Sequence, residues 1–174
     1  SSPVIWGERL FVTAEGEVRP DDAALKASDP APERLLLCYS LDGKLLWKHA
    51  APQPKEHEVL YWKNTLTSST PVTDGERIIA FLGNAGLLCC DLDGKRLWHV
   101  DVGVFPTTHG PASTPVLYQN LVILIQDQNK GQTLCAAFDK RTGGKVWQKE
   151  RKNAMGWSNP AVLRVADHDE LIFN

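Results

Sequence analysis

The sequence predicts an all-β fold: a β-propeller of four-stranded antiparallel blades, with about three and a half blades present. Three observations lead to this prediction. A motif of small residues and proline recurs along the chain, each full repeat holds four short β-rich runs, and a tryptophan lies in every fourth run. Four strands in about 45 residues are the signature of a propeller blade.

The repeat is defined by a motif in which small or polar residues precede a proline. The motif reads SSPV at 1–4, SSTPV at 68–72, ASTPV at 112–116 and SNPAV at 158–162. Its prolines lie 68, 44 and 45 residues apart, so the first copy is longer than the others by about 23 residues. We therefore expect a single partial propeller over 1–174, divided into blade 1 at 1–67, blade 2 at 68–111, blade 3 at 112–157 and a half blade at 158–174.

The extra length of the first copy is explained by the segment AEGEVRPDDAALKASDPAPE at 14–33. This segment is rich in proline, alanine and acidic residues and has no apolar period, which is typical of a loop. We predict a loop insertion that the fold does not need, because the segment has too few large apolar groups to build a core.

Blade 2 illustrates how the sequence specifies four strands. The runs TPVT, RIIAFL, GLLCCDL and RLWHVDV are separated by Asp74-Gly75, by the segment 83–86 and by Asp93-Gly94. An Asp-Gly pair between apolar runs is the strongest short signal for a β-hairpin, because both central residues of a type I′ turn need positive φ. Blade 3 repeats the pattern with TPVLY, LVILIQ, TLCAAF and KVWQKE, and the half blade supplies PAVLRV and ELIFN.

The fourth run of each full blade carries a tryptophan: Trp47, Trp98 and Trp147. A β-sandwich also has short strands and frequent turns, but it does not require one large side chain at the same place in every fourth strand. Blades that pack face to face around an axis do place such a side chain in each interface. The three tryptophans therefore favour the propeller, and we assign them a structural role in the repeat.

Composition and charge narrow the functional classes. The chain of 174 residues is 43% hydrophobic and 23% charged, with a formal net charge of −2. It has no basic run of the kind that neutralises phosphates, so we expect no nucleic-acid partner. No apolar run approaches the roughly 18 residues that cross a bilayer, so no membrane span is expected. The chain begins SSPVIW, without an initiator methionine or a signal peptide, and we expect a mature or excised segment.

The repeat resembles that of a known family. DKRTGGKVW at 139–147 is similar to the Asp-x-x-Thr-Gly-x-x-x-Trp core of the pyrroloquinoline-quinone-type propeller repeat, with Asp139, Thr142, Gly143 and Trp147 in place. Blades 1 and 2 have the shorter form Asp-Gly-Lys-x-x-Trp. The family includes quinoprotein alcohol dehydrogenases and the β-barrel-assembly lipoprotein of outer membranes. The resemblance implies a propeller and an exported (periplasmic or extracellular) protein, and it describes a scaffold rather than an activity.

The four cysteines are interpreted as small buried side chains. Cys38, Cys89 and Cys135 each lie four residues before an aspartate, which predicts one repeated position in the third strand. Equivalent positions in different blades lie around a ring, so these thiols are not expected to converge on a metal. Cys89 and Cys90 are adjacent on a strand and should point to opposite faces, so we expect no vicinal disulfide of the kind found in quinoprotein alcohol dehydrogenases.

Candidate binding residues lie on the connectors between blades, which border the central channel of a propeller. Surface loops on a rigid scaffold are where binding groups concentrate. An aromatic ring with a cation and amides nearby could stack on a planar anion and hydrogen-bond it, although the same side chains could instead cover the ends of the blade interfaces. The candidates are Tyr61, Trp62, Lys63 and Asn64 from the first connector, Thr108 and His109 from the second, and Trp157 from the third.

Two functions are compatible with the sequence. The first is a non-catalytic propeller that presents loops and strand edges to a protein or another ligand. The second is a fragment of a quinone-dependent alcohol or sugar dehydrogenase, for which the resemblance would imply pyrroloquinoline quinone with Ca²⁺. No catalytic residue, metal ligand or cofactor-binding residue is assigned, because neither a calcium shell nor a catalytic aspartate can be placed. DHDE at 167–170 falls between two strands and is interpreted as a solvated turn.

The half blade bears on the assembly of the protein. Its second strand, ELIFN, is expected to leave an unpaired edge, which is a template for another strand. We therefore expect that residues 1–174 belong to a longer propeller of about seven or eight blades, or that copies associate with one another through their open edges.

Overall fold

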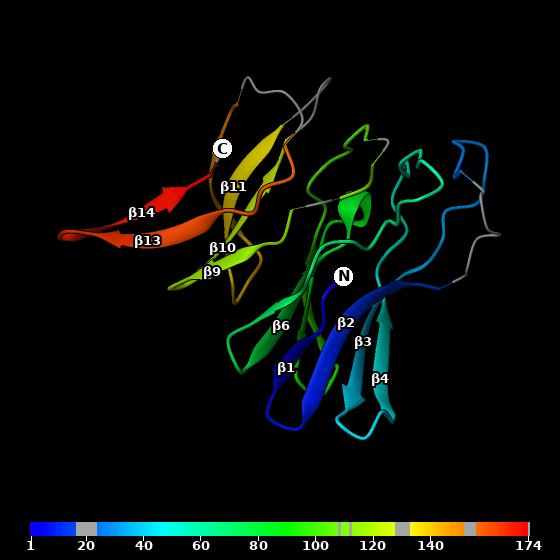
Figure 1. Cartoon of the computed structure of the whole chain (residues 1–174), viewed down its shortest axis with the longest axis horizontal. Helices are drawn as coiled ribbons and strands as arrows, with labels where there is room; N and C mark the ends of the chain where they lie inside the picture. Colours follow the sequence, from blue (N-terminus) through cyan, green and yellow to red (C-terminus); the bar gives the residue numbers. More distant parts are fainter. Residues whose placement is uncertain (17–23, 108, 112, 128–132, 152–155, 174) are drawn as a thin grey trace.

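The structure is a computed structural model, in which residues 1–16, 24–107, 109–111, 113–127, 133–151 and 156–173 are described (Figure 1). These residues form fourteen strands and one short 3-10 turn, η1 (Gly83–Ala85). No helix in this part of the chain is long and apolar enough to cross a membrane. The strands make three four-stranded antiparallel sheets and one two-stranded sheet, which confirms the predicted partial β-propeller.

Each sheet is one blade, and its strands lie in sequence order. The first strands of successive blades contact one another, so they lie nearest the axis. Blade 1 consists of β1 (Val4–Trp6), β2 (Arg9–Glu15), β3 (Arg34–Ser40) and β4 (Leu45–Ala50). Blade 2 consists of β5 (Val72–Thr73), β6 (Arg77–Phe81), β7 (Leu87–Asp91) and β8 (Arg96–Val100). Blade 3 consists of β9 (Val116–Tyr118), β10 (Leu121–Gln126), β11 (Leu134–Asp139) and β12 (Lys145–Lys149), and the half blade of β13 (Ala161–Val165) and β14 (His168–Ile172).

Alternate residues of blade 2 face its two neighbours. Ile78 and Cys90 belong to the core between blades 1 and 2, whereas Ile79 and Cys89 belong to the core between blades 2 and 3. This is the alternation that a pleated strand imposes on its side chains. The two adjacent thiols therefore point into different cores, and all four cysteines of the chain are free and buried.

The fourth-strand tryptophans join neighbouring blades. The Trp47 Nε1–H donates to the carbonyl oxygen of Leu92 in blade 2 at 3.0 Å, and the Trp98 Nε1–H makes the equivalent bond to blade 3 at the same distance. Each indole lies over a glycine of the next blade. A Cβ on Gly94 would come within 2.7 Å of the Trp47 ring, and a Cβ on Gly143 within 2.9 Å of the Trp98 ring. In blades 2 and 3, the Gly of the third-to-fourth-strand turn therefore makes room for the indole of the preceding blade.

The proline motif joins the first strands near the axis. The residue before each proline uses its backbone N–H to bond the side chain of its counterpart in the next blade. Ser2 donates to Thr70 Oγ1 at 3.3 Å, Thr70 to Thr114 Oγ1 at 3.1 Å, and Thr114 to Asn159 Oδ1 at 2.7 Å. The polar residue of the motif is thus a link between blades, a role that the sequence analysis did not assign.

Cys135 does not occupy the position predicted for it. Cys38 and Cys89 are each paired with the tryptophan of their own blade, but in blade 3 that partner is Ala137. Cys135 lies two residues earlier, opposite Lys149. The prediction was wrong because the aspartate used as the reference ends the third strand in blade 3, whereas in blades 1 and 2 it stands inside a shorter hairpin turn.

The insertion of blade 1 is more closely integrated than predicted. β2 runs to Glu15, so the first two residues of the predicted loop belong to a strand. Leu25 is 3% exposed and forms an antiparallel bridge with Leu60 of the first connector. Together with Leu66 these leucines make a small apolar cluster. A single leucine is therefore sufficient to dock the segment, and the expectation that the fold does not need the segment stays a prediction.

Candidate binding face on the blade connectors

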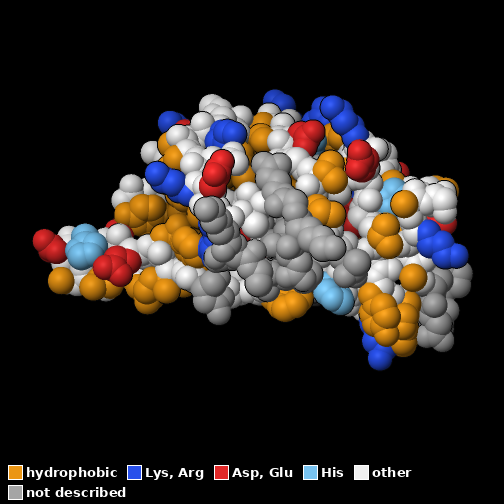
Figure 2. All heavy atoms as spheres, turned by 90° about the horizontal axis from the view of Figure 1, so that it is seen from above, with side chains coloured by type: hydrophobic (Ala, Val, Ile, Leu, Met, Phe, Trp, Pro, Cys, Tyr) orange, Lys and Arg blue, Asp and Glu red, His pale blue; other side chains and the backbone are white. Residues whose placement is uncertain are grey.

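The connectors between blades lie at one end of the molecule, the upper end in Figure 1, together with the insertion and η1. We call this end the connector face. Figure 2 views the molecule from this end, and hydrophobic, basic and acidic side chains are interspersed over its surface. The described residues of the connector face fall within 24–33, 51–71, 82–86, 101–115 and 150–160.

A tight turn at 61–64 carries aromatic side chains on the first connector. The Asn64 N–H donates to the Tyr61 carbonyl oxygen at 3.0 Å, which closes the turn. The Tyr61 and Trp62 side chains are 49% and 40% exposed, and their ring centroids lie 5.7 Å apart. The Lys63 ammonium lies 4.6 Å from the centroid of the Trp62 ring. The structure thus brings these predicted candidates together as one aromatic and cationic tip, which we call the 61–64 turn.

The predicted candidates on the three connectors are joined by a chain of contacts. The Asn64 Nδ2 lies 3.2 Å from His109 Nδ1, and the His109 ring lies 6.0 Å from the ring of Trp157, which is 57% exposed. If the amide donates, His109 Nδ1 is the unprotonated nitrogen of a neutral imidazole and the proton is on Nε2. Thr108, the remaining candidate, lies outside the described residues.

The base of the 61–64 turn is buried and closely packed. Leu60, which precedes the turn, is buried against Leu25 and Leu66. On the other side, Gly110 of the second connector approaches so closely that a Cβ there would lie 2.4 Å from the Thr65 carbonyl oxygen. The 61–64 turn therefore presents exposed aromatic rings on a base that has little room to move.

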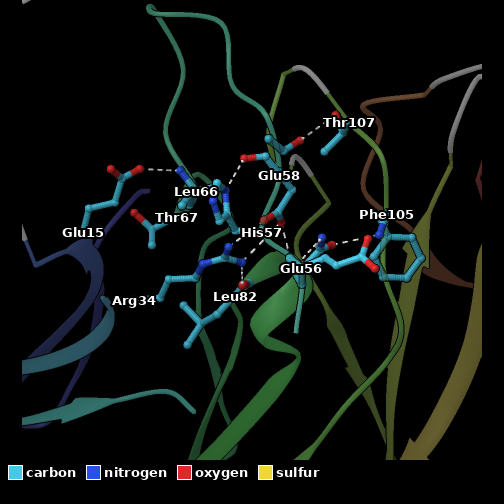
Figure 3. A network of polar contacts seen from close by, with 12 residues as sticks. Glu15, Arg34, Glu56, His57, Glu58, Leu66, Thr67, Leu82, Phe105 and Thr107 are labelled. Carbon is cyan, nitrogen blue, oxygen red and sulfur yellow. Dashed lines mark hydrogen bonds and ion pairs between the residues drawn. The ribbon is translucent and has the colours of Figure 1, made fainter. Parts of the chain in front are cut away.

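A buried ion pair lies beneath the connector face (Figure 3). Arg34, the first residue of β3, places Nη2 2.5 Å from Glu58 Oε2, and both side chains are 1% exposed. Arg34 Nη1 also donates to the Leu82 carbonyl oxygen at 2.6 Å, and Glu58 Oε1 accepts the Asn84 N–H at 2.8 Å. The pair therefore ties blade 1 and the first connector to the β6–β7 turn of blade 2.

Asn84 extends this network to the second connector. Its Oδ1 accepts the Phe105 N–H at 2.8 Å, and its Nδ2 donates to the Glu56 carbonyl oxygen at 3.0 Å. Phe105 is itself buried edge-on against Phe81, with ring centroids 6.5 Å apart. Polar groups that are removed from water must find partners inside the protein, and these bonds supply them. The network thus fixes the first and second connectors on blade 2.

No motif or spacing in the sequence pointed to Arg34, Glu58 or Asn84. Two signals were present: Arg34 opens the otherwise apolar run RLLLC, and Asn84 lies between glycines in a very short connection. Neither signal identifies a partner, because Arg34 and Glu58 are 24 residues apart in the sequence, with the rest of β3 and all of β4 between them.

A second buried pair lies at the end of β10 that is nearest the connector face. Asp127 Oδ2 is 3.2 Å from Arg151 Nη2, and the Arg151 guanidinium lies 4.3 Å from the centroid of the Phe173 ring. Burial raises the pKa of Asp127 above its usual range, while the charge of Arg151 opposes that rise. These contacts join blade 3 to the half blade, and the sequence did not predict them.

Among the described residues there is no group of three or more His, Cys, Asp or Glu side chains that could hold a metal ion. At the start of β14, His168 lies 3.1 Å from Asp167 and 2.9 Å from Glu170. Hydrogen bonds to Asp167 and Glu170 raise the pKa of His168 above its usual value. All three side chains are exposed, but the interpretation of 167–170 as a turn was wrong for residues 168–170, because the turn is at 166–167 and β14 begins at His168.

The blades, the motif that links their first strands and the docked indoles define a propeller of repeated four-stranded units. A family model described as outer membrane protein assembly factor BamB matches residues 32–174. Because this match spans most of the chain, the chain belongs to that family, whose repeats are of the pyrroloquinoline-quinone type. A comparison with curated proteins gives no significant match.

The solved structures that match this chain include the following three. A europium-containing methanol dehydrogenase is 12% identical with a TM-score of 0.59, over 87% of this chain and 24% of its own. A quinohemoprotein alcohol dehydrogenase from Pseudomonas putida HK5 is 14% identical with a TM-score of 0.55, over 85% and 20%. BamB from Moraxella catarrhalis is 11% identical with a TM-score of 0.47, over 86% and 47%. The chain thus spans a quarter or less of either dehydrogenase, and identities this low show the fold alone.

Proposed function

We propose that the chain is part of a non-catalytic propeller that binds a protein partner through its connector face. The observation that best supports the proposal is the 61–64 turn, in which exposed Tyr61 and Trp62 stand on a buried and closely packed base. His109 and Trp157 extend the same surface to the second and third connectors.

Exposed aromatic side chains on a fixed base suit a protein interface for two reasons. Tryptophan and tyrosine are enriched among the residues whose truncation weakens protein complexes by about 2 kcal/mol or more. A turn that is already ordered also loses little conformational freedom when a partner binds, so more of the contact energy appears as affinity. Lys63, which lies over the Trp62 ring, would place a cation at the rim of this contact.

We further propose that the protein is exported and that its partner lies in the same compartment, as membership of the family suggests. The open edge of β14 would then pair with further propeller blades, from the same polypeptide or from another copy. Neither the proposed export nor the proposed pairing of β14 assigns a further binding residue to the connector face.

Site-specific photo-crosslinking in intact cells tests the proposed interface. A photoreactive phenylalanine analogue is placed at position 62 or, as a control, at position 97. Leu97 is 41% exposed, almost the same as Trp62, but it lies on β8 and away from the connectors. We expect a defined cross-linked protein from position 62 and none from position 97. No product from position 62, or the same products from both positions, would contradict the proposal.

The alternative proposal is a fragment of a quinone-dependent alcohol or sugar dehydrogenase, since two of the structures with this fold are dehydrogenases. Such an enzyme would hold pyrroloquinoline quinone with Ca²⁺, which requires a shell of oxygen ligands. The described residues do not fit that requirement by themselves, so no chemical step is derived through the cofactor. Dye-linked alcohol oxidation by the whole protein after addition of the quinone and Ca²⁺ would establish the alternative.

A further inference from the structure

We infer that the insertion of blade 1 is a positioning element that fixes the orientation of the 61–64 turn. The consequence for binding rests on the proposed function, whereas the positioning itself does not. The described part of the insertion, residues 24–33, contacts the first connector at two places before the turn begins.

The first contact fixes the residue that precedes the turn. The Leu25 N–H donates to the Leu60 carbonyl oxygen at 3.1 Å, and the Leu60 N–H donates back to the Leu25 carbonyl oxygen at 3.0 Å. The buried Leu25 side chain packs with Leu60 and Leu66, which lie on either side of the turn in the sequence. One residue of the insertion therefore holds both ends of the segment 60–66.

The second contact lies three residues earlier in the connector. His57 Nε2 lies 2.9 Å from the Asp29 carbonyl oxygen. Asp29 is held in place by a local turn, because its N–H donates to the Lys26 carbonyl oxygen at 3.0 Å and its Oδ2 accepts the Lys26 N–H at 2.8 Å. The insertion thus holds the connector at 57 as well as at 60, on both sides of the buried Glu58.

Residues outside the segment 24–33 hold the connector at other positions. Arg34 and Asn84 fix Glu58, and the Asn64 side chain contacts His109. Glu15 Oε1 accepts the Leu66 N–H at 2.5 Å, and Gly110 packs against the Thr65 carbonyl group. Without residues 24–33, the connector would keep its contacts at 58 and at 64 to 66 and would lose those at 57 and 60. The residue that precedes the 61–64 turn would then lose its backbone hydrogen bonds, and the Tyr61 and Trp62 side chains would sample several orientations.

The docking of the insertion is separate from the cores between blades. Leu25, Leu60 and Leu66 form a cluster of their own, distinct from the two larger clusters that hold the blades together. Small clusters beneath loops open at lower free energy than the main core. A change in the insertion can therefore alter the presentation of Tyr61 and Trp62 while the blades stay folded, which makes the insertion a determinant of specificity for the proposed partner.

Amide hydrogen exchange in the whole protein tests this inference. Leu25→Ala should accelerate exchange of the Leu60 and Asn64 amides by at least about tenfold. Truncating a buried leucine lowers the free energy of local opening by more than a tenfold change in exchange rate requires. Amides in β6 and β10 should keep their rates. Leu25→Met fills similar space and should retain slow exchange. Lys26→Ala removes an exposed side chain from the same insertion and should change nothing.

Two results would overturn the inference. Unchanged exchange at Leu60 and Asn64 in Leu25→Ala would mean that the turn is held without the insertion. Acceleration throughout the blades would mean that Leu25 supports the whole fold rather than the turn. Because exchange is measured without a partner, faster local exchange combined with no cross-link from position 62 would support the positioning role and reject the proposed function.

Discussion

Glu58→Ala should destabilise the protein by about 3 to 5 kcal/mol, because it leaves a buried guanidinium without its counter-charge. Arg34 is 1% exposed and would keep only its bond to the Leu82 carbonyl oxygen among the partners described above. The Asn84 N–H would also lose its acceptor, which adds about 1 kcal/mol. The alanine cannot replace either contact, and the site is too enclosed for the arginine to reach solvent without local opening.

An exposed arginine–carboxylate pair with a similar shortest distance provides the control. Arg9 Nη2 lies 2.6 Å from Asp93 Oδ1, compared with 2.5 Å between Arg34 and Glu58, but the Arg9 and Asp93 side chains are 32% and 82% exposed. Exposed pairs contribute less than about 1 kcal/mol, because water screens the charges and solvates each partner when the other is removed. Asp93→Ala should therefore cost much less than Glu58→Ala, and the difference isolates the effect of burial.

Urea unfolding at fixed pH and salt, followed by tryptophan fluorescence, measures the loss of unfolding free energy in Glu58→Ala and in Asp93→Ala. The comparison requires that the slope of unfolding free energy against urea concentration is the same in each variant. The double variant Arg34→Met with Glu58→Leu removes both charges and should be less destabilised than Glu58→Ala alone. Equal losses for Glu58→Ala and Asp93→Ala, or a loss below about 1 kcal/mol for Glu58→Ala, would refute the conclusion that this ion pair is desolvated.

Four further outcomes are expected. Gly94→Ala should lower the melting temperature more than Gly43→Ala. Both glycines have φ near +90°, but only a Cβ at position 94 would meet an indole, at 2.7 Å. Equal shifts in melting temperature would mean that the indole moves aside freely. Burial raises the pKa of Cys89 and Cys90 to about 12, so a thiol reagent should not label them in the native protein at about pH 8, and labelling before unfolding would contradict their burial. Because the unfolded thiols ionise near pH 9.0, the unfolded state loses protons first, and stability should fall as the pH rises above that value. Ala166→Gly should raise the calorimetric stability by about 1 kcal/mol, because φ is +49° at this alanine, and no gain would show that the turn is unstrained.

The regular part of the fold could be predicted because its determinants are local and recur. Asp74-Gly75 and Asp93-Gly94 mark the turns between strands correctly, but only the glycine of each pair has positive φ, so the prediction that these turns are of type I′ was wrong. The alternation of side chains on β7 follows from the pleat, so Cys89 and Cys90 point into different cores as expected. Each of these inferences needed only neighbouring residues and the geometry of a strand.

The features that the sequence did not reveal depend on single contacts between distant segments. Leu25 is an isolated leucine in a polar loop, and its partner Leu60 lies in another connector. Arg34 and Glu58 are charged residues, which are ordinarily expected at the surface. Both are buried because each neutralises the charge of the other, and the sequence does not show that they meet. Cys135 was misplaced because sequence spacing does not reveal where a strand ends and a turn of different length begins.

Contacts that recur from blade to blade and contacts that occur once lie in different parts of the molecule. Docked indoles and links between proline motifs recur, and a repeat protein needs only interfaces of this kind to stack its units. The Arg34–Glu58 pair, the Leu25–Leu60 bridge and the contact of His57 with the insertion occur once, and all lie at the connector face. A buried ion pair adds little net stability compared with apolar residues of the same volume, so it is a poor device for strengthening a blade interface. Its position beneath the 61–64 turn, together with the docked insertion, supports the view that these single contacts hold a binding surface in one conformation.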